Sequence, residues 1–247
     1  MQIDRGHPLS RGLALCYLLN EGAGSRVNDS VRGRGGSLLN SPTWQAGQGQ
    51  GLRFIAAQSS SVSLNSPPLS SGNVPFTMVA LFRAEFTTIS YLYSEANTGN
   101  NSTLAEIDFS NANVRFPLRN DTGTLLISQT NLSYADGNWH VLAGVSEGNG
   151  RNALLYYDGR LVASVLNVLG TNITPNAAMI GSRPQLSPVY GTVDIAGVWG
   201  YNRILSAGEV AQLSAEPFQM FGKIAVPVYY SIGSRISPFW YARNVHQ

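Results

Sequence analysis

Cysteine, lysine and charged residues in general are scarce in this sequence of 247 residues. Cys16 is the only cysteine, which excludes an intrachain disulfide, and its position in an apolar run indicates a small buried side chain. None of the three histidines has a recognisable catalytic context, so Cys16 is not predicted to be a nucleophile. Charged residues make up only 12% of the chain, and the formal net charge of +2 is too small to indicate a nucleic-acid partner.

Long apolar runs are also absent. The run at residues 12–19 is too short to cross a membrane, and it lacks the cleavage site of a secretory signal. We therefore expect no membrane partner and no secretory leader.

Glycine is abundant, with 26 residues, and short apolar segments recur between turns. Residues 76–82 read as a strand whose residues 76, 78 and 82 share one face, and residues 139–145 read as another. Asp158-Gly159 favours a tight hairpin turn, because this pair readily adopts positive φ. About a dozen such segments predict an all-β protein.

Only one segment is typical of a helix. Ser206 is a favourable N-cap, and Glu209 follows three residues later, as in a capping box. Pro217 ends the segment, which predicts one short helix near 206–214. A single helix among many strands favours a β-sandwich over an α/β fold.

Six segments, in the family's order, resemble the LamG-like domains of the concanavalin A-like lectin and glucanase group. They are the opening strand and loop at 12–24 and 27–30, the strand at 76–82, the turn and strand at 136–141, the hairpin at 157–162, Ile180-Gly181, and the late strand at 191–206. The resemblance covers residues 9–217 and implies a concanavalin-like jelly-roll β-sandwich. The predicted division is a LamG-like jelly roll at 1–217 and a C-terminal extension at 218–247.

The two ends of the chain, at 7–13 and 216–221, resemble a subset of these domains found in bacteriophages and prophages. The extension has no acidic residue and carries seven aromatic residues. Because a solvated tail rarely exposes so many aromatic side chains, we expect it to pack on its own domain or on another chain. The residues predicted to dock on a partner are Tyr229, Tyr230, Arg235, Phe239, Trp240, Tyr241 and Arg243.

These ends predict a non-enzymatic surface protein of a phage virion, such as a capsid decoration protein, assembled in the host cytoplasm. Its partners would be further copies of itself and other virion proteins such as capsid subunits. The alternative is a carbohydrate-binding module of a phage or bacterial surface protein, at the cell surface or outside the cell, with surface glycans as partners.

Glu106 and Asp108 suggest a third possible function, that of a glycoside hydrolase. Laminarinase-type glycoside hydrolases share the jelly roll and carry the pattern Glu-x-Asp-x-x-Glu on one strand, where the two glutamates act as nucleophile and acid. Here no second glutamate follows Asp108, so the proton donor is missing and no catalytic residue is predicted. The two carboxylates are then strand residues available for contacts with a sugar or an ion.

A structural calcium ion is the cofactor that the resemblance implies. LamG-like domains hold it with an aspartate of the opening loop, sometimes helped by the late strand. In this sequence the matching residues are Asp29, Asn28 and Asp194, whose oxygens suit calcium. The departure is Ala196, where an acidic residue is usual in the family.

Aromatic residues near loops are the candidates for stacking on a glycan. Trp44, Tyr134 and Tyr190 are the predicted set, with Tyr91 and Tyr93 as further candidates. Trp139 belongs to a family motif that places it in the core.

Overall fold

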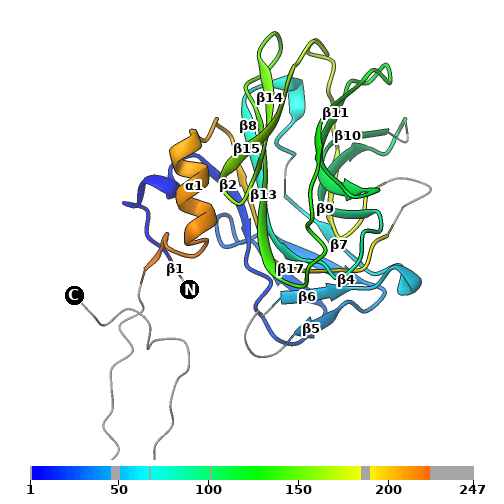
Figure 1. The fold of residues 1–247 in the computed structure, drawn as a ribbon. Helices are drawn as coiled ribbons and strands as arrows, with labels where there is room; N and C mark the ends of the chain where they lie inside the picture. Colours follow the sequence, from blue (N-terminus) through cyan, green and yellow to red (C-terminus); the bar gives the residue numbers. More distant parts are fainter. Residues whose placement is uncertain (1, 46–50, 67, 101, 185–189, 223–247) are drawn as a thin grey trace, which may run out of the picture.

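The computed structural model describes residues 2–45, 51–66, 68–100, 102–184 and 190–222. Two antiparallel sheets pack face to face (Figure 1), so the predicted jelly-roll sandwich is confirmed. The first, called here the β10 sheet, has the spatial order β12 (Leu125–Asn131), β11 (Asn113–Arg119), β10 (Ser102–Ser110), β9 (Ser90–Asn97), β16 (Ala177–Ile180), β7 (Ser61–Leu64), β4 (Gly35–Leu39) and β3 (Arg26–Asn28). The second, called the β17 sheet, has the order β15 (Arg160–Leu166), β14 (Asn152–Tyr157), β13 (Trp139–Ser146), β8 (Phe76–Arg83), β17 (Val193–Tyr201), β6 (Gly51–Phe54) and β5 (Thr43–Gln45), with β2 (Leu13–Tyr17) also paired to β17.

Strand β8 shows how the core between the sheets is built. Its residues Phe76, Met78 and Phe82 point inward and are fully buried, as their alternation predicts. Across the core, the rings of Phe76 and Phe116 meet edge to face with their centroids 6.1 Å apart. Gly144 is required beside them, because a Cβ at this position would lie 2.3 Å from the Phe116 ring.

The outer face of the β17 sheet is apolar as well. Val79 and Trp199 point away from the first core and are fully buried in a second hydrophobic cluster. Val210 and Leu213, the buried residues of α1 (Ala207–Ala215), belong to the same cluster. Figure 1 shows α1 lying on this side of the sandwich, so the helix covers part of the outer face of the β17 sheet.

The predicted helix is confirmed together with its capping box. The Glu209 N–H donates to Ser206 Oγ at 3.3 Å, and the Ser206 N–H donates to the Glu209 carboxylate at 2.9 Å. Arg203 donates to both oxygens of the same carboxylate, at 3.0 and 2.7 Å. The hydrogen bonds from Arg203 are the main cause that lowers the pKa of Glu209 to about 2.

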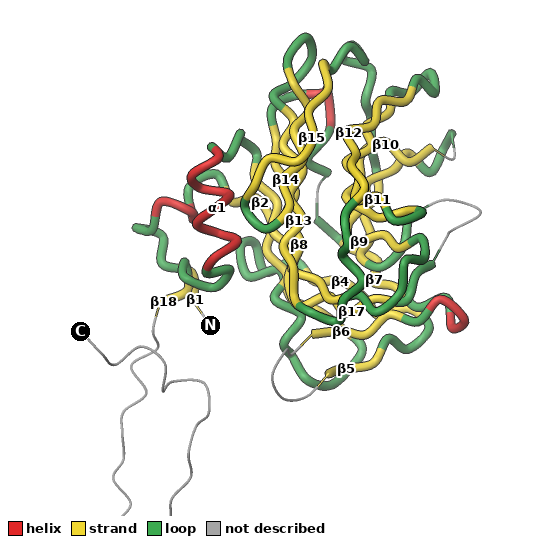
Figure 2. The backbone as a smooth tube through the Cα atoms, viewed as in Figure 1, coloured by secondary structure: helices red, strands yellow, loops and turns green. Residues whose placement is uncertain are grey.

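The first and last described strands lie side by side. Strand β1 (Gln2–Ile3) pairs with β18 (Phe221–Gly222) next to α1 (Figure 2). Phe218, Met220 and Phe221 pack with the second hydrophobic cluster, so the first residues of the predicted extension contact their own domain. The seven residues predicted to dock on a partner lie outside the described residues, and that docking stays a prediction.

Three short 3-10 helices complete the described elements, at η1 (Pro8–Ser10), η2 (Ala56–Gln58) and η3 (Ser71–Asn73). No helix in the described part of the chain is long and apolar enough to cross a membrane.

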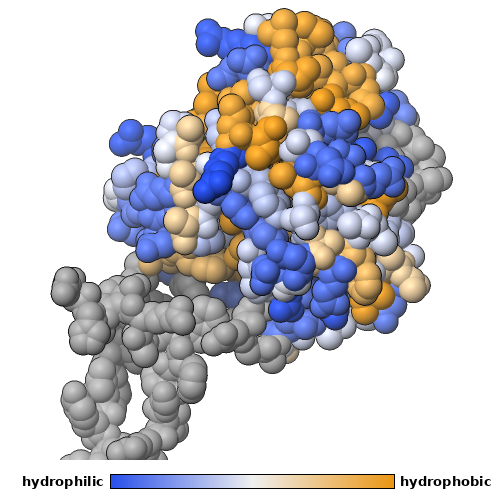
Figure 3. Space-filling model, viewed as in Figure 1, coloured by the Kyte–Doolittle hydropathy of each residue, from blue (hydrophilic) through white to orange (hydrophobic). Residues whose placement is uncertain are grey.

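Figure 3 shows apolar atoms concentrated toward the upper end of the view, where β14 and β15 lie in Figure 1. Leu161 and Leu166 of β15 and the following Val168 are each more than half exposed.

Candidate functional site: the outer face of the β10 sheet

The outer face of the β10 sheet is polar. On β10, Ile107 and Phe109 point into the core, so Glu106 and Asp108 point outward, as alternation predicts. The strand register places Glu106 opposite Ser94, Ser94 opposite Met179, Met179 opposite Ser63, and Ser63 opposite Ser37. A row of mostly small polar side chains therefore crosses five strands and ends at the two carboxyl groups.

Asp108 is held by a bidentate ion pair. Arg115 of the neighbouring strand β11 donates from Nε and Nη2 to the two Asp108 oxygens, at 2.7 Å each. Asp108 is fully buried, and burial raises its pKa, while the hydrogen bonds from Arg115 act in the opposite direction. Since both oxygens are bonded to a guanidinium, Asp108 is the ionised member of the carboxyl pair.

Glu106 is the member of the pair that holds a proton more readily. Burial, and then the charge of Asp108, raises the pKa of Glu106 well above its ordinary value. A hydrogen bond from Glu106 in turn lowers the pKa of Asp108, so the proton of Glu106 is directed at Asp108. Glu106 Oε2 has no hydrogen-bond partner among the described residues, and the residue keeps 8% of its surface exposed.

Arg183 approaches the pair from the segment that follows β16. The Ser94 hydroxyl donates to the Ser182 carbonyl at 2.6 Å, which fixes this segment over the sheet. The Arg183 guanidinium lies 5.4 Å from the centroid of the Tyr91 ring, and its buried Nε has no partner in the described part of the chain. Burial is the main cause that raises the pKa of Tyr91 to about 12, so Tyr91 stays a neutral phenol.

The strand has no place for a third carboxylate. Strand β10 ends at Ser110, and Asn111 and Ala112 form a two-residue turn with φ values of 50° and 65°. The position of the second glutamate in the laminarinase-type pattern is Asn111, inside this turn. The Glu-x-Asp-x-x-Glu pattern is therefore incomplete on this strand.

The predicted calcium ligands do not form one cluster. Asp29 accepts hydrogen bonds from the backbone N–H groups of Cys16 and Val31, both at 2.9 Å, and is 2% exposed. The Asn28 side chain donates to Glu21. These contacts are those of an aspartate that organises a loop.

Asp194 lies in a different environment, between two arginines. Arg53 donates to it at 2.8 Å, and Arg83 donates to it at 2.6 Å, so its charge is neutralised by guanidinium groups. Among the described residues, no group of three or more His, Cys, Asp or Glu side chains could hold a metal ion. Calcium binding stays a prediction, and the geometry assigns it no ligand set.

One of the three predicted glycan-stacking residues is unsuitable. Tyr134 is fully buried, with its ring 4.5 Å from that of Phe109 between centroids, and it cannot meet a ligand. Trp44 is partly buried against the core, and its Nε1 donates to the Gly24 carbonyl at 3.0 Å. Tyr190 is partly exposed. Among the further candidates, Tyr91 lies in the polar cluster.

His140 has both ring nitrogens paired with carboxylates. Its Nδ1 lies 2.7 Å from Asp158 and its Nε2 lies 3.0 Å from Asp136. Burial acts to lower the pKa of His140, but the two carboxylates outweigh burial and raise it.

Sequence reasoning missed Arg115 and Arg183. Arg115 could have been found from the hairpin, because a two-residue turn at 111–112 sets Asp108 opposite Arg115. Arg183 lies in the short segment between β16 and Pro184, and no periodicity indicates where such a segment lies. Its position depends on the contact of Ser182 with Ser94.

Residues 56–211 match the family model described as the concanavalin A-like lectin/glucanases superfamily, Laminin_G_3. The chain belongs to this superfamily. The predicted LamG-like resemblance is thereby confirmed, and the matched region contains β10, the site carboxyl groups and Arg183. No curated protein matches the sequence significantly.

Solved structures similar to this chain include binding domains of botulinum neurotoxins and of a paraclostridial mosquitocidal protein. The binding domain of Paraclostridial Mosquitocidal Protein 1 has 13% identity and a TM-score of 0.69, and the match covers 85% of this chain and 53% of that one. The binding domain of Botulinum Neurotoxin DC "in complex with SialylT" has 10% identity and a TM-score of 0.67, covering 84% and 52%. A botulinum neurotoxin type C structure, whose description states that cell entry depends on interaction with two ganglioside molecules, has 11% identity and a TM-score of 0.68, covering 84% and 52%. The chain spans about half the length of these solved chains, and likeness at such identities shows the fold alone.

Proposed function

We propose that this chain is a non-catalytic, lectin-like domain that binds carbohydrate on the outer face of the β10 sheet. The observation that carries the proposal is the polar row ending at Glu106, Asp108 and Arg115, on the sheet that α1 does not cover. Sugar recognition needs a few precisely placed polar groups, and this face offers carboxyl and guanidinium groups held in place by Asp108–Arg115 and Arg183–Tyr91 contacts. The toxin binding domains that share the fold, described with sialylated and ganglioside ligands, support a binding role.

A glycan array with the purified full chain tests this proposal. We expect retention of a defined group of glycans and no release of reducing sugar from soluble polysaccharides. The array is run with calcium and with a chelator, which also tests the calcium prediction. A folded protein that retains no glycan in either condition would overturn the binding role, and released sugar would overturn the non-catalytic role.

The setting we propose for this domain is the surface of a phage virion, beside capsid subunits. Its support is the resemblance of the segments at 7–13 and 216–221 to phage and prophage domains. Mass spectrometry of purified virions from a producing strain tests it. Absence of the chain from virions overturns this setting, and full incorporation of a chain truncated after Gly222 overturns the docking role of the extension.

A further inference from the structure

Two unsatisfied polar atoms lie on the face described above. Glu106 Oε2 and Arg183 Nε are both buried, and neither has a hydrogen-bond partner in the described part of the chain. Buried polar groups in folded proteins nearly always have a partner, so each unpartnered group calls for an explanation. Here one group is an acceptor and the other is a donor.

Glu106 presents an acceptor because of its neighbours on β10 and β11. Arg115 occupies both oxygens of Asp108, and the proton of Glu106 is directed at Asp108. The carboxyl group of Glu106 then has one oxygen committed to that contact. Its other oxygen, Oε2, remains a carbonyl-like acceptor.

Arg183 presents a donor because it has no anionic partner. Its guanidinium stacks on Tyr91, and no ion pair joins it to a described carboxylate. Tyr91 is paired with Asp108 in the strand register, so the guanidinium over the Tyr91 ring lies beside the part of β10 that carries Glu106. Arg115, by contrast, is neutralised by Asp108.

We propose that Glu106 and Arg183 form a two-point site for adjacent hydroxyl groups of a neutral sugar. This inference rests on the proposed carbohydrate-binding function and names the ligand class and the residues. One hydroxyl donates to Glu106 Oε2, and the oxygen of the neighbouring hydroxyl accepts from Arg183 Nε–H.

Charged ligands fit this pair less well. A carboxylate or sulfate could accept from Arg183, but it has no hydrogen to donate to Glu106 Oε2 and would bring a negative charge near Asp108. An ammonium group could donate to Glu106, but it would face the guanidinium groups of Arg115 and Arg183. A hydroxyl both donates and accepts without a charge, so it satisfies both atoms.

Four variants test the site on the array, using lactose and sialyllactose as a matched neutral and acidic pair among the immobilised sugars. Glu106→Leu removes the hydrogen-bond acceptor and Arg183→Leu removes the donor. We expect each variant to weaken binding of neutral glycans about tenfold or more. Glu106→Gln keeps an acceptor toward the ligand and a donor toward Asp108, so we expect binding within about twofold of the unaltered chain. Arg151→Leu, at an exposed arginine of the β13–β14 turn, is the matched control and should not change binding.

The outcomes separate this inference from the proposed function. If the unaltered chain retains no glycan, the proposed function fails. If it retains glycans but Glu106→Leu and Arg183→Leu bind equally well, the binding function stands and this site is wrong. If the chain prefers sialyllactose to lactose, or if Glu106→Gln loses binding, the inference that the ligand is a neutral sugar is wrong. Circular dichroism of each variant confirms that a loss of binding is not a loss of fold.

Discussion

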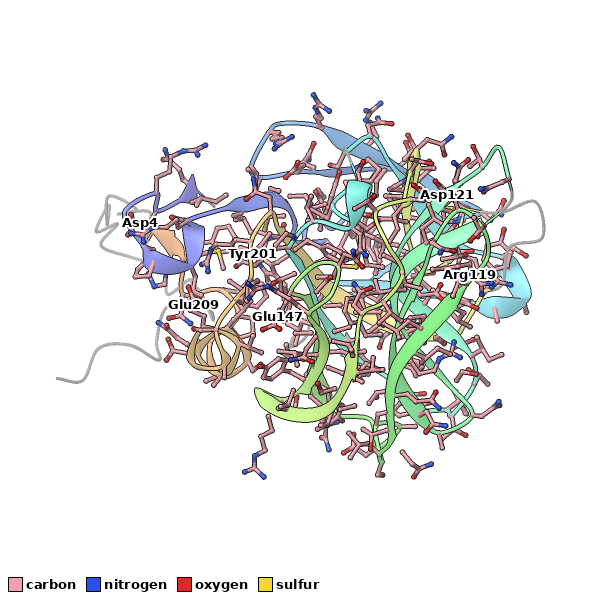
Figure 4. The ribbon with its side chains drawn as sticks, turned by 90° about the horizontal axis from the view of Figure 1, so that it is seen from above. Asp4, Arg119, Asp121, Glu147, Tyr201 and Glu209 are labelled. Atoms are coloured by element: carbon pink, nitrogen blue, oxygen red, sulfur yellow. The ribbon has the colours of Figure 1, made fainter. Side chains whose placement is uncertain are left out.

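The outer faces of the two sheets differ although both sheets are built from the same alternating strands. On the β17 sheet the outward residues are apolar, among them Val79 and Trp199, and α1 packs on them. On the β10 sheet the outward residues are Ser94, Glu106 and Asp108. Figure 4 shows the two sides: Glu209 lies on α1 with Tyr201 on the same side of the molecule, and Arg119 and Asp121 lie at the opposite side.

The outward-facing residues of the two sheets therefore have different roles. The inward positions of both sheets make the common core. The outward positions of the β17 sheet extend the buried apolar volume and add stability, whereas those of the β10 sheet hold polar side chains that bond to one another and to neighbouring segments. Substitutions on the two faces should therefore change different measured quantities.

The largest effect on stability is expected from Trp199→Ala on the β17 sheet. Trp199 is fully buried and packs against Phe218 with centroids 5.9 Å apart, so truncation should cost about 3–5 kcal/mol of unfolding free energy. Urea denaturation measures the loss. Trp44→Ala, at a partly buried tryptophan, is the control and should cost much less. Equal losses for the two variants would contradict a structural role specific to the covered face.

Arg115→Met tests whether the polar face also supports the fold. Removing Arg115 leaves Asp108 buried beside Glu106 without its counter-ion, which should destabilise the protein by about 3 kcal/mol. Adding Asp108→Leu to this variant should restore most of the lost stability, because the stranded charge is then removed. If Arg115→Met alone unfolds at the urea concentration of the unaltered chain, the ion pair contributes nothing to stability.

Glu106→Gln gives a smaller effect with a distinctive pH dependence. The groups that surround Glu106 electrostatically are Asp108, Arg115, Arg119, Arg183 and Tyr91. Burial and the Asp108 charge raise the pKa of Glu106 in the folded chain. In the unfolded chain the pKa of a glutamate is about 4.3. Above that pH, ionisation of Glu106 favours the unfolded chain.

The glutamine variant should therefore be more stable than the unaltered chain at about pH 7 and equally stable at about pH 4. Thermal melts at both pH values measure this. A variant that is less stable than the unaltered chain at neutral pH would show that Glu106 is ionised and paired in the folded protein.

The smallest effect is expected from Ser206→Ala at the start of α1. The variant removes the side-chain half of the capping box and should cost about 1 kcal/mol. Ser206→Asp, which keeps a capping oxygen, should retain stability in the same urea experiment. A null result for the alanine variant would mean that packing of Val210 and Leu213, and not the cap, fixes the helix.

Much of the fold could be predicted because its signals are local. Alternation in 76–82, the Asp158-Gly159 turn and the Ser206 cap each act within a few residues, and all three are present in the structure. Glu106 and Asp108 were expected to be accessible strand carboxylates, but both are buried on the outward face of β10.

The remaining site residues depend on long-range contacts. Tyr134 looked like a loop residue free to meet a glycan, but its position against Phe109 follows from how the chain after β12 folds over the core. Arg183 lies near the β9–β10 pair only because β16 is next to β9 in space, although the two strands are about 80 residues apart in sequence. No periodicity or turn pattern encodes such a neighbour.

The pairing of β1 with β18 has a mechanical consequence. A pulling force applied between Gln2 and Gly222 acts first on a ladder of only two residue pairs, which opens one pair at a time. The longer ladders of β8, β13 and β17 would carry load only after that short ladder has separated. In a force-extension measurement with handles at these two positions, we expect a weak early event followed by a stronger one that marks rupture of the sandwich.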